Sequence, residues 1–134
     1  MATASDFASW AVPDLILPLG GRTYTVRPPS VGDMGKLIAC AVRGEVDLGI
    51  VEGPIPDEVQ EILDTITGDE HPALGDVYAQ LVADGVHPVT IDRMTYYAIF
   101  YWARGQEYAD ALATLLFAPR ELGAAEEAEA APKD

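Results

Sequence analysis

The sequence predicts a helix-dominant α+β fold, in which an N-terminal β-hairpin precedes about five amphipathic helices. The hairpin follows from two short β-prone runs joined by Gly20-Gly21, because a tight hairpin turn needs positive φ at both central residues. The helices follow from apolar residues that recur at i, i+3, i+4 and i+7 after residue 30, the spacing of one helical face. With 134 residues, 49% of them apolar, the chain is long enough for one globular domain, which we place at residues 14–122.

The hairpin is predicted at residues 15–27, after an N-terminal arm at residues 1–13. Alternation along the second strand turns Tyr24 and Val26 inward. Pro18 indicates that the first strand is an edge or bulged strand, because proline cannot donate a ladder hydrogen bond.

Three amphipathic helices are then predicted at about residues 30–43, 56–67 and 72–84. The first begins at the capping pattern Ser30-Val-Gly-Asp33 and is expected to end at Gly44. The buried stripe should contain Val31, Met34, Leu37, Ile38, Ala41 and Val42 in the first helix, and Val59, Ile62, Leu63 and Ile66 in the second.

A helix that holds five of the eleven aromatic residues is predicted at residues 90–104. We expect it to be the central buried helix, or to be half-buried in the monomer and completed by a partner. Thr90 is a suitable N-cap, Asp92 suits the positive end of the helix dipole, and Gly105 suits the C-terminal end. Both faces of this helix are apolar, so we expect it to be covered on more than one side. One face carries Met94, Tyr97, Ala98, Tyr101 and Trp102, and the other carries Tyr96, Ile99 and Phe100.

A last helix is predicted at residues 106–117, with Tyr108, Ala111, Leu112, Leu115 and Leu116 on one face. Residues 123–134 are acidic and of low complexity, which is typical of a disordered, flexible tail.

The charge pattern limits the partners. The net charge is −14, and residues 44–92 hold twelve carboxylates without a single Lys or Arg. Such a field repels nucleic acid and anionic membranes, so neither is expected as a partner, whereas a basic protein would be attracted. No apolar run approaches the roughly 20 residues that span a bilayer, and the first residues lack the pattern of a signal peptide. We therefore expect a cytoplasmic protein.

Few residues could support chemistry. His71 and His87 are sixteen residues apart, without the spacing of a zinc pair, and Cys40 has no histidine near it in sequence. Gly20-Gly21 lacks the pattern of a phosphate-binding loop. We predict no catalytic residue, no metal and no cofactor, and hence no enzyme.

The aromatic helix and the helix after it are the best candidates for binding, because Tyr and Trp combine large contact area with a polar group. The alternative, in which these residues are all core, stays open. The predicted partner-binding residues are Tyr96, Ile99, Phe100, Trp102, Tyr108, Leu112, Leu115 and Leu116.

Three stretches match a known family in order and spacing. The first is residues 15–30, an apolar–Pro–apolar–Gly–x–x–Tyr strand pair that leads into a helix. The second is residues 74–86, which are similar to G-x-x-Y-x-x-(M/L)-x-x-D-G-V, and the third is the aromatic helix with its short link, residues 89–102. Over about residues 14–118 the chain resembles the small tail assembly chaperones of long-tailed bacteriophages, particularly those that infect actinobacteria.

The resemblance implies a non-enzymatic protein of a phage or prophage. It would bind the helix-rich tape measure protein, keep the apolar segments of that protein from aggregating, and help tail-tube subunits assemble around it. Further implied partners are a frameshifted longer form of the same protein and the major tail protein; a homo-oligomer also stays open. The implied location is the host cell cytoplasm and not the mature virion.

Two other functions stay open. A structural tail-terminator or head–tail connector subunit would remain in the finished virion in ring stoichiometry. An acidic decoy directed at the host would mimic nucleic acid through residues 44–92 and bind a basic protein.

Overall fold

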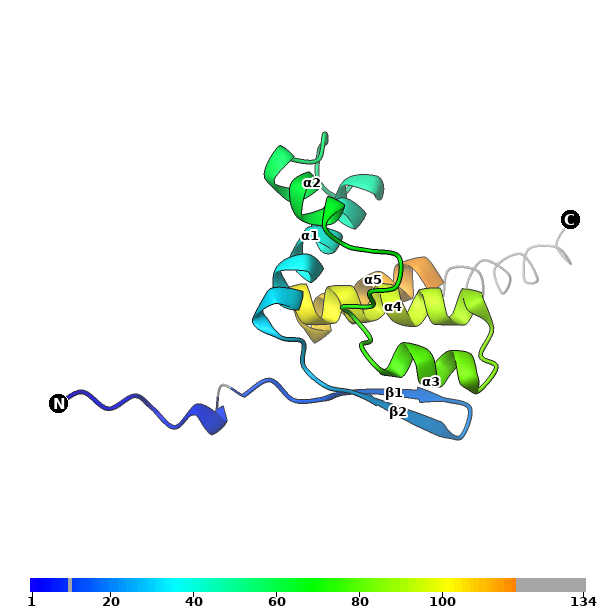
Figure 1. Cartoon of the computed structure of the whole chain (residues 1–134), viewed down its shortest axis with the longest axis horizontal. Helices are drawn as coiled ribbons and strands as arrows, with labels where there is room; N and C mark the ends of the chain where they lie inside the picture. Colours follow the sequence, from blue (N-terminus) through cyan, green and yellow to red (C-terminus); the bar gives the residue numbers. More distant parts are fainter. Residues whose placement is uncertain (10, 118–134) are drawn as a thin grey trace, which may run out of the picture.

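The computed structural model describes residues 1–9 and 11–117. The predicted fold class is confirmed: a two-stranded antiparallel hairpin is followed by five α-helices (Figure 1). The predicted tail at residues 123–134 lies outside the described residues. The elements are a 3-10 turn η1 (Phe7–Ser9), β1 (Leu15–Leu19), β2 (Arg22–Val26), α1 (Val31–Asp47), α2 (Asp57–Asp64), α3 (Val77–Ala83), α4 (Pro88–Arg104) and α5 (Gln106–Phe117).

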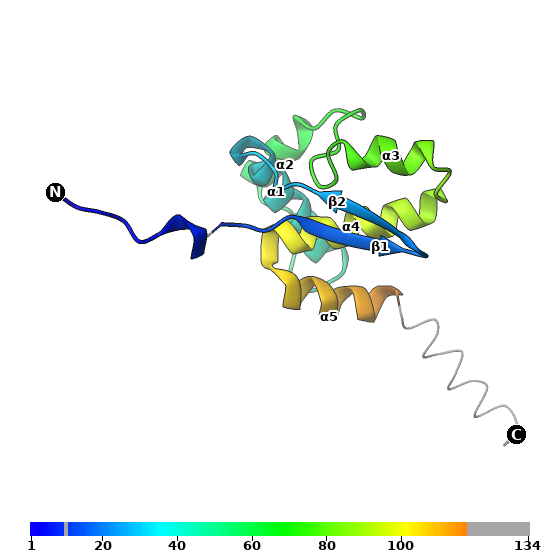
Figure 2. The same ribbon diagram turned by 90° about the horizontal axis from the view of Figure 1, so that it is seen from below.

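The hairpin has the predicted turn. Gly20 and Gly21 have φ values of 51° and 83°, which only glycine adopts without strain. Tyr24 and Val26 are buried as predicted. The N-terminal arm runs away from the domain (Figures 1 and 2).

Pro18 lies in an edge strand without a bulge, because the register from Leu15↔Val26 to Leu19↔Arg22 is continuous. Residues that flank a two-residue turn exchange both backbone hydrogen bonds, and bonded and non-bonded pairs alternate from there. The pair Pro18↔Thr23 is therefore a non-bonded one. The N–H group that proline lacks would have faced the open edge of β1, so Pro18 weakens that edge as a template for another strand.

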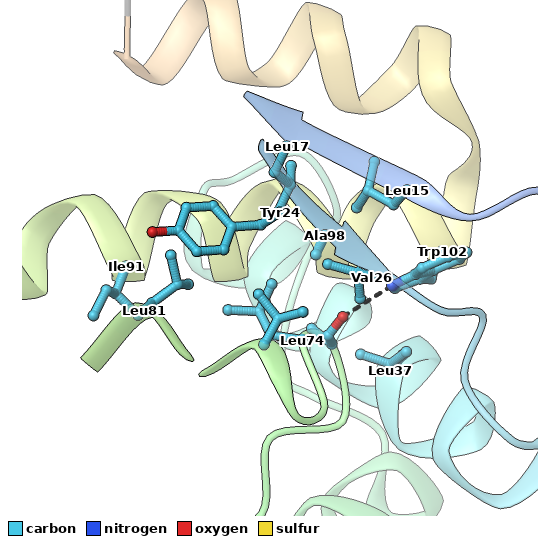
Figure 3. Close-up of a cluster of buried hydrophobic side chains, with 12 residues drawn as sticks. Leu15, Leu17, Tyr24, Val26, Leu37, Leu74, Leu81, Ile91, Ala98 and Trp102 are labelled. Atoms are coloured by element: carbon cyan, nitrogen blue, oxygen red, sulfur yellow. Dashed lines mark hydrogen bonds between the residues drawn. The ribbon is translucent and has the colours of Figure 1, made fainter. Parts of the chain in front are cut away.

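Helix α4 is the centre of the molecule, as its two apolar faces predict. One face belongs to a buried cluster that includes Tyr24, Leu81 and Trp102 (Figure 3). The indole Nε1–H of Trp102 donates a 2.9 Å hydrogen bond to the carbonyl of Ala73. The other face carries Phe100, which packs in a second cluster with Ala41 of α1 and with Ala109 and Leu112 of α5.

Helix α1 is longer than predicted, because Gly44 lies inside it rather than at its end. Gly44 packs against two side chains of α4: a Cβ atom there would lie 3.0 Å from Cζ of Phe100 and 3.0 Å from the hydroxyl oxygen of Tyr96. The glycine therefore serves close packing between two helices and not helix termination. Sequence alone does not separate these two uses of glycine.

Alanine at Gly44 should lower the free energy of unfolding. The overpacking cost of about 1–3 kcal/mol exceeds the gain of about 0.5–1 kcal/mol that alanine brings to a helix interior. Gly35→Ala is the matched control, since a Cβ atom at Gly35 meets nothing within 4 Å, and it should stabilise the protein. Urea denaturation of both variants checks this; equal stabilisation would mean that the ring of Phe100 moves aside freely.

The buried face of α1 is rotated from the predicted stripe. Leu37 and Ala41 are buried as predicted, but Val31 and Ile38 are 93% and 43% exposed. Three of the five buried residues of α1, namely Leu37, Ala41 and Gly44, lie on one face at i, i+4 and i+7; the other two are Ala39 and Glu45.

Helix α4 begins at Pro88, two residues before the predicted start. Its N-cap is His87, whose ring Nδ1 accepts a 3.1 Å hydrogen bond from the N–H of Val89. Proline suits the first position of a helix because the N–H it lacks would be unpaired there. The predictions that Thr90 is the N-cap and that Asp92 lies in the first turn are therefore wrong.

Helices α2 and α3 are both shorter than predicted. After Asp64 the backbone of α2 changes to i→i−3 hydrogen bonds, such as the 3.0 Å bond from the N–H of Thr65 to the carbonyl of Ile62. Residues 72–76 form turns before α3 because Gly75 has a φ of 54°, which a right-handed helix cannot accommodate. In α2, Leu63 is buried as predicted, whereas Ile62 is 40% exposed.

Candidate functional site

The eight predicted partner-binding residues lie at three depths. Phe100, Trp102 and Leu112 are only 1%, 7% and 8% exposed. Phe100 of α4 packs with Leu112 of α5 and Ala41 of α1, and the segment before α3 covers Trp102. This depth assigns them to the core rather than to a partner-binding surface. Leu115 is exposed, and the remaining four are half-buried: Tyr96, Ile99, Tyr108 and Leu116.

An apolar groove lies between β1 and α5, and α4 forms its floor. Figure 2 shows β1 and α5 running beside each other on the same side of the domain. The groove has a volume of about 340 Å³, and we call it the β1–α5 groove. Its lining consists of Ile16, Leu17, Pro18, Thr90, Arg93, Met94, Tyr97, Asp110 and Phe117.

A second apolar hollow adjoins this groove at the ends of three helices, and we call it the helix-end hollow. Its volume is about 310 Å³, and its lining consists of Leu48, Val89, Asp92, Arg93, Tyr96, Leu116 and Phe117. Arg93 and Phe117 line both spaces. The guanidinium carbon of Arg93 lies 5.4 Å from the centroid of the Phe117 ring, so this cation–π pair stands between the groove and the hollow.

Exposed apolar side chains surround the two spaces. Ile16 on β1 is 50% exposed and Val89 at the start of α4 is 51% exposed. Leu48, at the end of α1, is also exposed. The combination of a hollow and exposed apolar side chains is typical of sites that bind apolar segments of another protein.

A hydrogen bond joins the α4 floor of the β1–α5 groove to its α5 wall. The hydroxyl of Tyr97 on α4 donates a hydrogen bond to a carboxylate oxygen of Asp110 on α5. Burial of the ring, followed by this hydrogen bond to a carboxylate, raises the pKa of Tyr97. The phenol therefore stays a neutral donor and occupies one oxygen of Asp110.

Of the eight predicted residues, Tyr96 and Leu116 line the helix-end hollow; other lining residues, such as Ile16, Val89 and Arg93, were not among the predicted ones. One signal was present: alternation along β1 places Ile16 on the face opposite Leu15 and Leu17. The groove itself joins segments more than 70 residues apart, which helical periodicity cannot reveal.

Residues 5–134 match the family described as a domain of unknown function, DUF7426. The chain belongs to the DUF7426 family. No curated protein and no solved structure matches it.

An acidic hollow of about 500 Å³ lies elsewhere on this DUF7426 domain, lined in part by Asp33, Asp69, Glu70 and His71. Glu70 pairs with Lys36, and the ring of His71 stacks on Tyr78 with centroids 3.5 Å apart. Within the described part of the chain, no three His, Cys, Asp or Glu side chains are grouped so that they could hold a metal ion.

The other candidate reactive group of this DUF7426 domain is Cys40, a half-buried free thiol on α1. Burial raises the pKa of the Cys40 thiol, which disfavours the thiolate that reacts. None of the helices in residues 11–117 has the length and apolar character that a bilayer crossing requires.

Proposed function

We propose that this protein is a tail assembly chaperone of a long-tailed phage or prophage, and that it holds apolar helical segments of the tape measure protein in the β1–α5 groove and the helix-end hollow. The observation that carries the proposal is the pair of adjoining apolar spaces with exposed Ile16 and Val89 beside them. The resemblance of about residues 14–118 to phage tail chaperones supplies the identity of the client.

The client segment is a helix rather than a strand. Strand addition requires a row of free donors and acceptors on a sheet edge, but Pro18 removes one donor from the open edge of β1. A groove with a helical floor and apolar walls suits the apolar face of an amphipathic helix instead. The net charge of −14 keeps the complex soluble and attracts clients that are basic overall.

Co-expression with the tape measure protein of the same phage tests the proposal. Soluble tape measure protein should co-purify with the wild-type chain. Glu at either Ile16 or Val89 should reduce the recovered complex at least about tenfold, because a buried unpaired carboxylate costs more than 1.4 kcal/mol of binding. Both side chains are half exposed, at 50% and 51%, so both variants should fold.

Ile62→Glu and Val82→Glu are the matched controls, because these side chains lie outside both spaces and are 40% and 54% exposed. Both should retain wild-type recovery. Unchanged insolubility of the tape measure protein with the wild-type chain would refute the function. Mass spectrometry of purified virions should find the protein absent or at trace level; ring stoichiometry would indicate a structural subunit.

A further inference from the structure

Arg93 is a half-buried cation without a counter-ion among the described residues. The ion pairs within residues 1–9 and 11–117 join Arg22 with Asp84, Lys36 with Glu70, and Arg104 with Glu45. The described contact of Arg93 is its cation–π contact with the ring of Phe117. A half-buried arginine without a counter-ion among the described residues is suited to receive an anion from outside.

The nearby carboxylates do not meet this need. Asp110 lines the same groove, but it accepts the hydroxyl hydrogen of Tyr97. Asp92 is exposed and lies more than 4.0 Å from the Arg93 nitrogens, since the two form no ion pair. The guanidinium of Arg93 presents its N–H groups in a planar fork, the geometry that binds a carboxylate through two hydrogen bonds.

We propose that the β1–α5 groove and the helix-end hollow bind an amphipathic helix that carries one Asp or Glu within its apolar face. The carboxylate pairs with Arg93, and apolar residues about one turn before and after it enter the groove and the hollow. This inference rests on the proposed function, because it specifies the chemistry of the bound segment. Residues four positions before and after the carboxylate lie on the same face of the bound helix. They can therefore enter the two apolar spaces on either side of Arg93.

The charge preferred at Arg93 is opposite to the charge preferred by the whole surface. The chain as a whole favours basic partners, whereas Arg93 selects an acidic residue at one position of the bound face. A client therefore needs basic residues on its outer face and a carboxylate on its inner one. This combination distinguishes the intended segment from other apolar helices.

Synthetic helical peptides of about 15–20 residues test the inference. They share a leucine face and a lysine-bearing outer face, and differ only in the central residue of the leucine face, which is Glu, Gln or Lys. Binding to the full chain is measured by titration calorimetry. The wild-type chain should bind the Glu peptide at least about tenfold more tightly than the Gln peptide.

Charge exchange at Arg93 makes the test specific. Arg93→Gln should remove the preference for the Glu peptide, Arg93→Lys should retain part of it, and Arg93→Glu should prefer the Lys peptide. Arg27→Gln is the matched control, because Arg27 is exposed and lines neither space, and it should leave the preference unchanged. Melting temperatures of all variants establish that they fold.

The outcomes separate this inference from the proposed function. Equal binding of the Glu and Gln peptides by the wild-type chain, or binding of neither, would overturn the inference. If the tape measure protein still co-purifies in that case, the function stands and the role of Arg93 alone is wrong. If the Glu peptide is preferred through Arg93 but the tape measure protein never co-purifies, the inference holds and the function is wrong.

Discussion

Replacing Trp102 with alanine will lower the free energy of unfolding by about 3–5 kcal/mol, the usual loss for a large buried aromatic residue. Trp102 is 7% exposed and packs in the cluster that joins the hairpin to α4. The substitution also leaves the carbonyl of Ala73 without its indole donor. Urea denaturation followed by circular dichroism measures the loss.

Trp102→Phe separates the two contributions, because it keeps an aromatic ring but removes the N–H group. We expect Trp102→Phe to lower the free energy of unfolding less than Trp102→Ala does. The difference between the two variants measures the contribution of the packed ring. If Trp102→Ala left stability nearly unchanged while it abolished client binding, Trp102 would belong to the interface and the account of the core would be wrong.

Replacing Glu45 with alanine should lower the free energy of unfolding by about 2–3 kcal/mol, because it breaks an ion pair whose carboxylate is buried, together with its hydrogen bonds. Glu45 is 6% exposed. Its carboxylate accepts hydrogen bonds from Nη2 of Arg104 at 2.8 Å, from Nε of Arg104 at 3.1 Å and from the hydroxyl of Tyr108 at 2.6 Å. The three side chains fasten α1 to the junction of α4 and α5. Arg104 stays partly exposed to water, so the loss of unfolding free energy should be smaller than for a fully buried ion pair.

The same network predicts a pH dependence. The hydrogen bonds from Arg104 are the main reason why the pKa of Glu45 is lowered, against the opposing effect of burial. The unfolded chain therefore takes up a proton at a higher pH than the folded one does. The stabilisation is complete above the unfolded carboxyl pKa of about 4.3 and is lost as pH falls through the lower folded value.

Unfolding measured from pH 7 to pH 3 should show this loss in the wild-type chain and a shallower one in Glu45→Gln. Some slope should persist in the variant, because the pKa values of Asp69 and Glu70 are also lowered. Tyr108→Phe serves as the control: it removes one hydrogen bond, at a cost of about 1 kcal/mol, and keeps the ion pair. Identical pH profiles for wild type and Glu45→Gln would contradict the role of the network.

The sequence was sufficient for the fold class because the hairpin and the helices each have a local pattern. Gly20-Gly21 specifies the turn because glycine readily adopts positive φ. The burial of Tyr24 and Val26 follows from the alternation of side chains between the two faces of a strand. The end of α1 could not be predicted from local sequence. A glycine such as Gly44 often ends a helix, but here it packs against Phe100, which is 56 residues away in the sequence.

The candidate site was harder to predict for the same reason. The aromatic character of α4 correctly marked the centre of the molecule, but a central helix buries its largest residues, including Phe100 and Trp102. The proposed binding surface instead uses exposed residues around this helix, such as Ile16 of β1 and Val89 at the start of α4. Their role depends on how β1 and the ends of α1 and α5 meet around α4, which no local pattern encodes.

Backbone amide hydrogen exchange, compared for the chain alone and in complex with the tape measure protein, tests the proposed binding surface most directly. Protection gained on binding should fall on β1, on the first half of α4 and on the end of α5, which line the β1–α5 groove and the helix-end hollow. Exchange in α2 and α3 should be unchanged. Protection confined to α2, α3 or the acidic hollow around His71 would contradict the account.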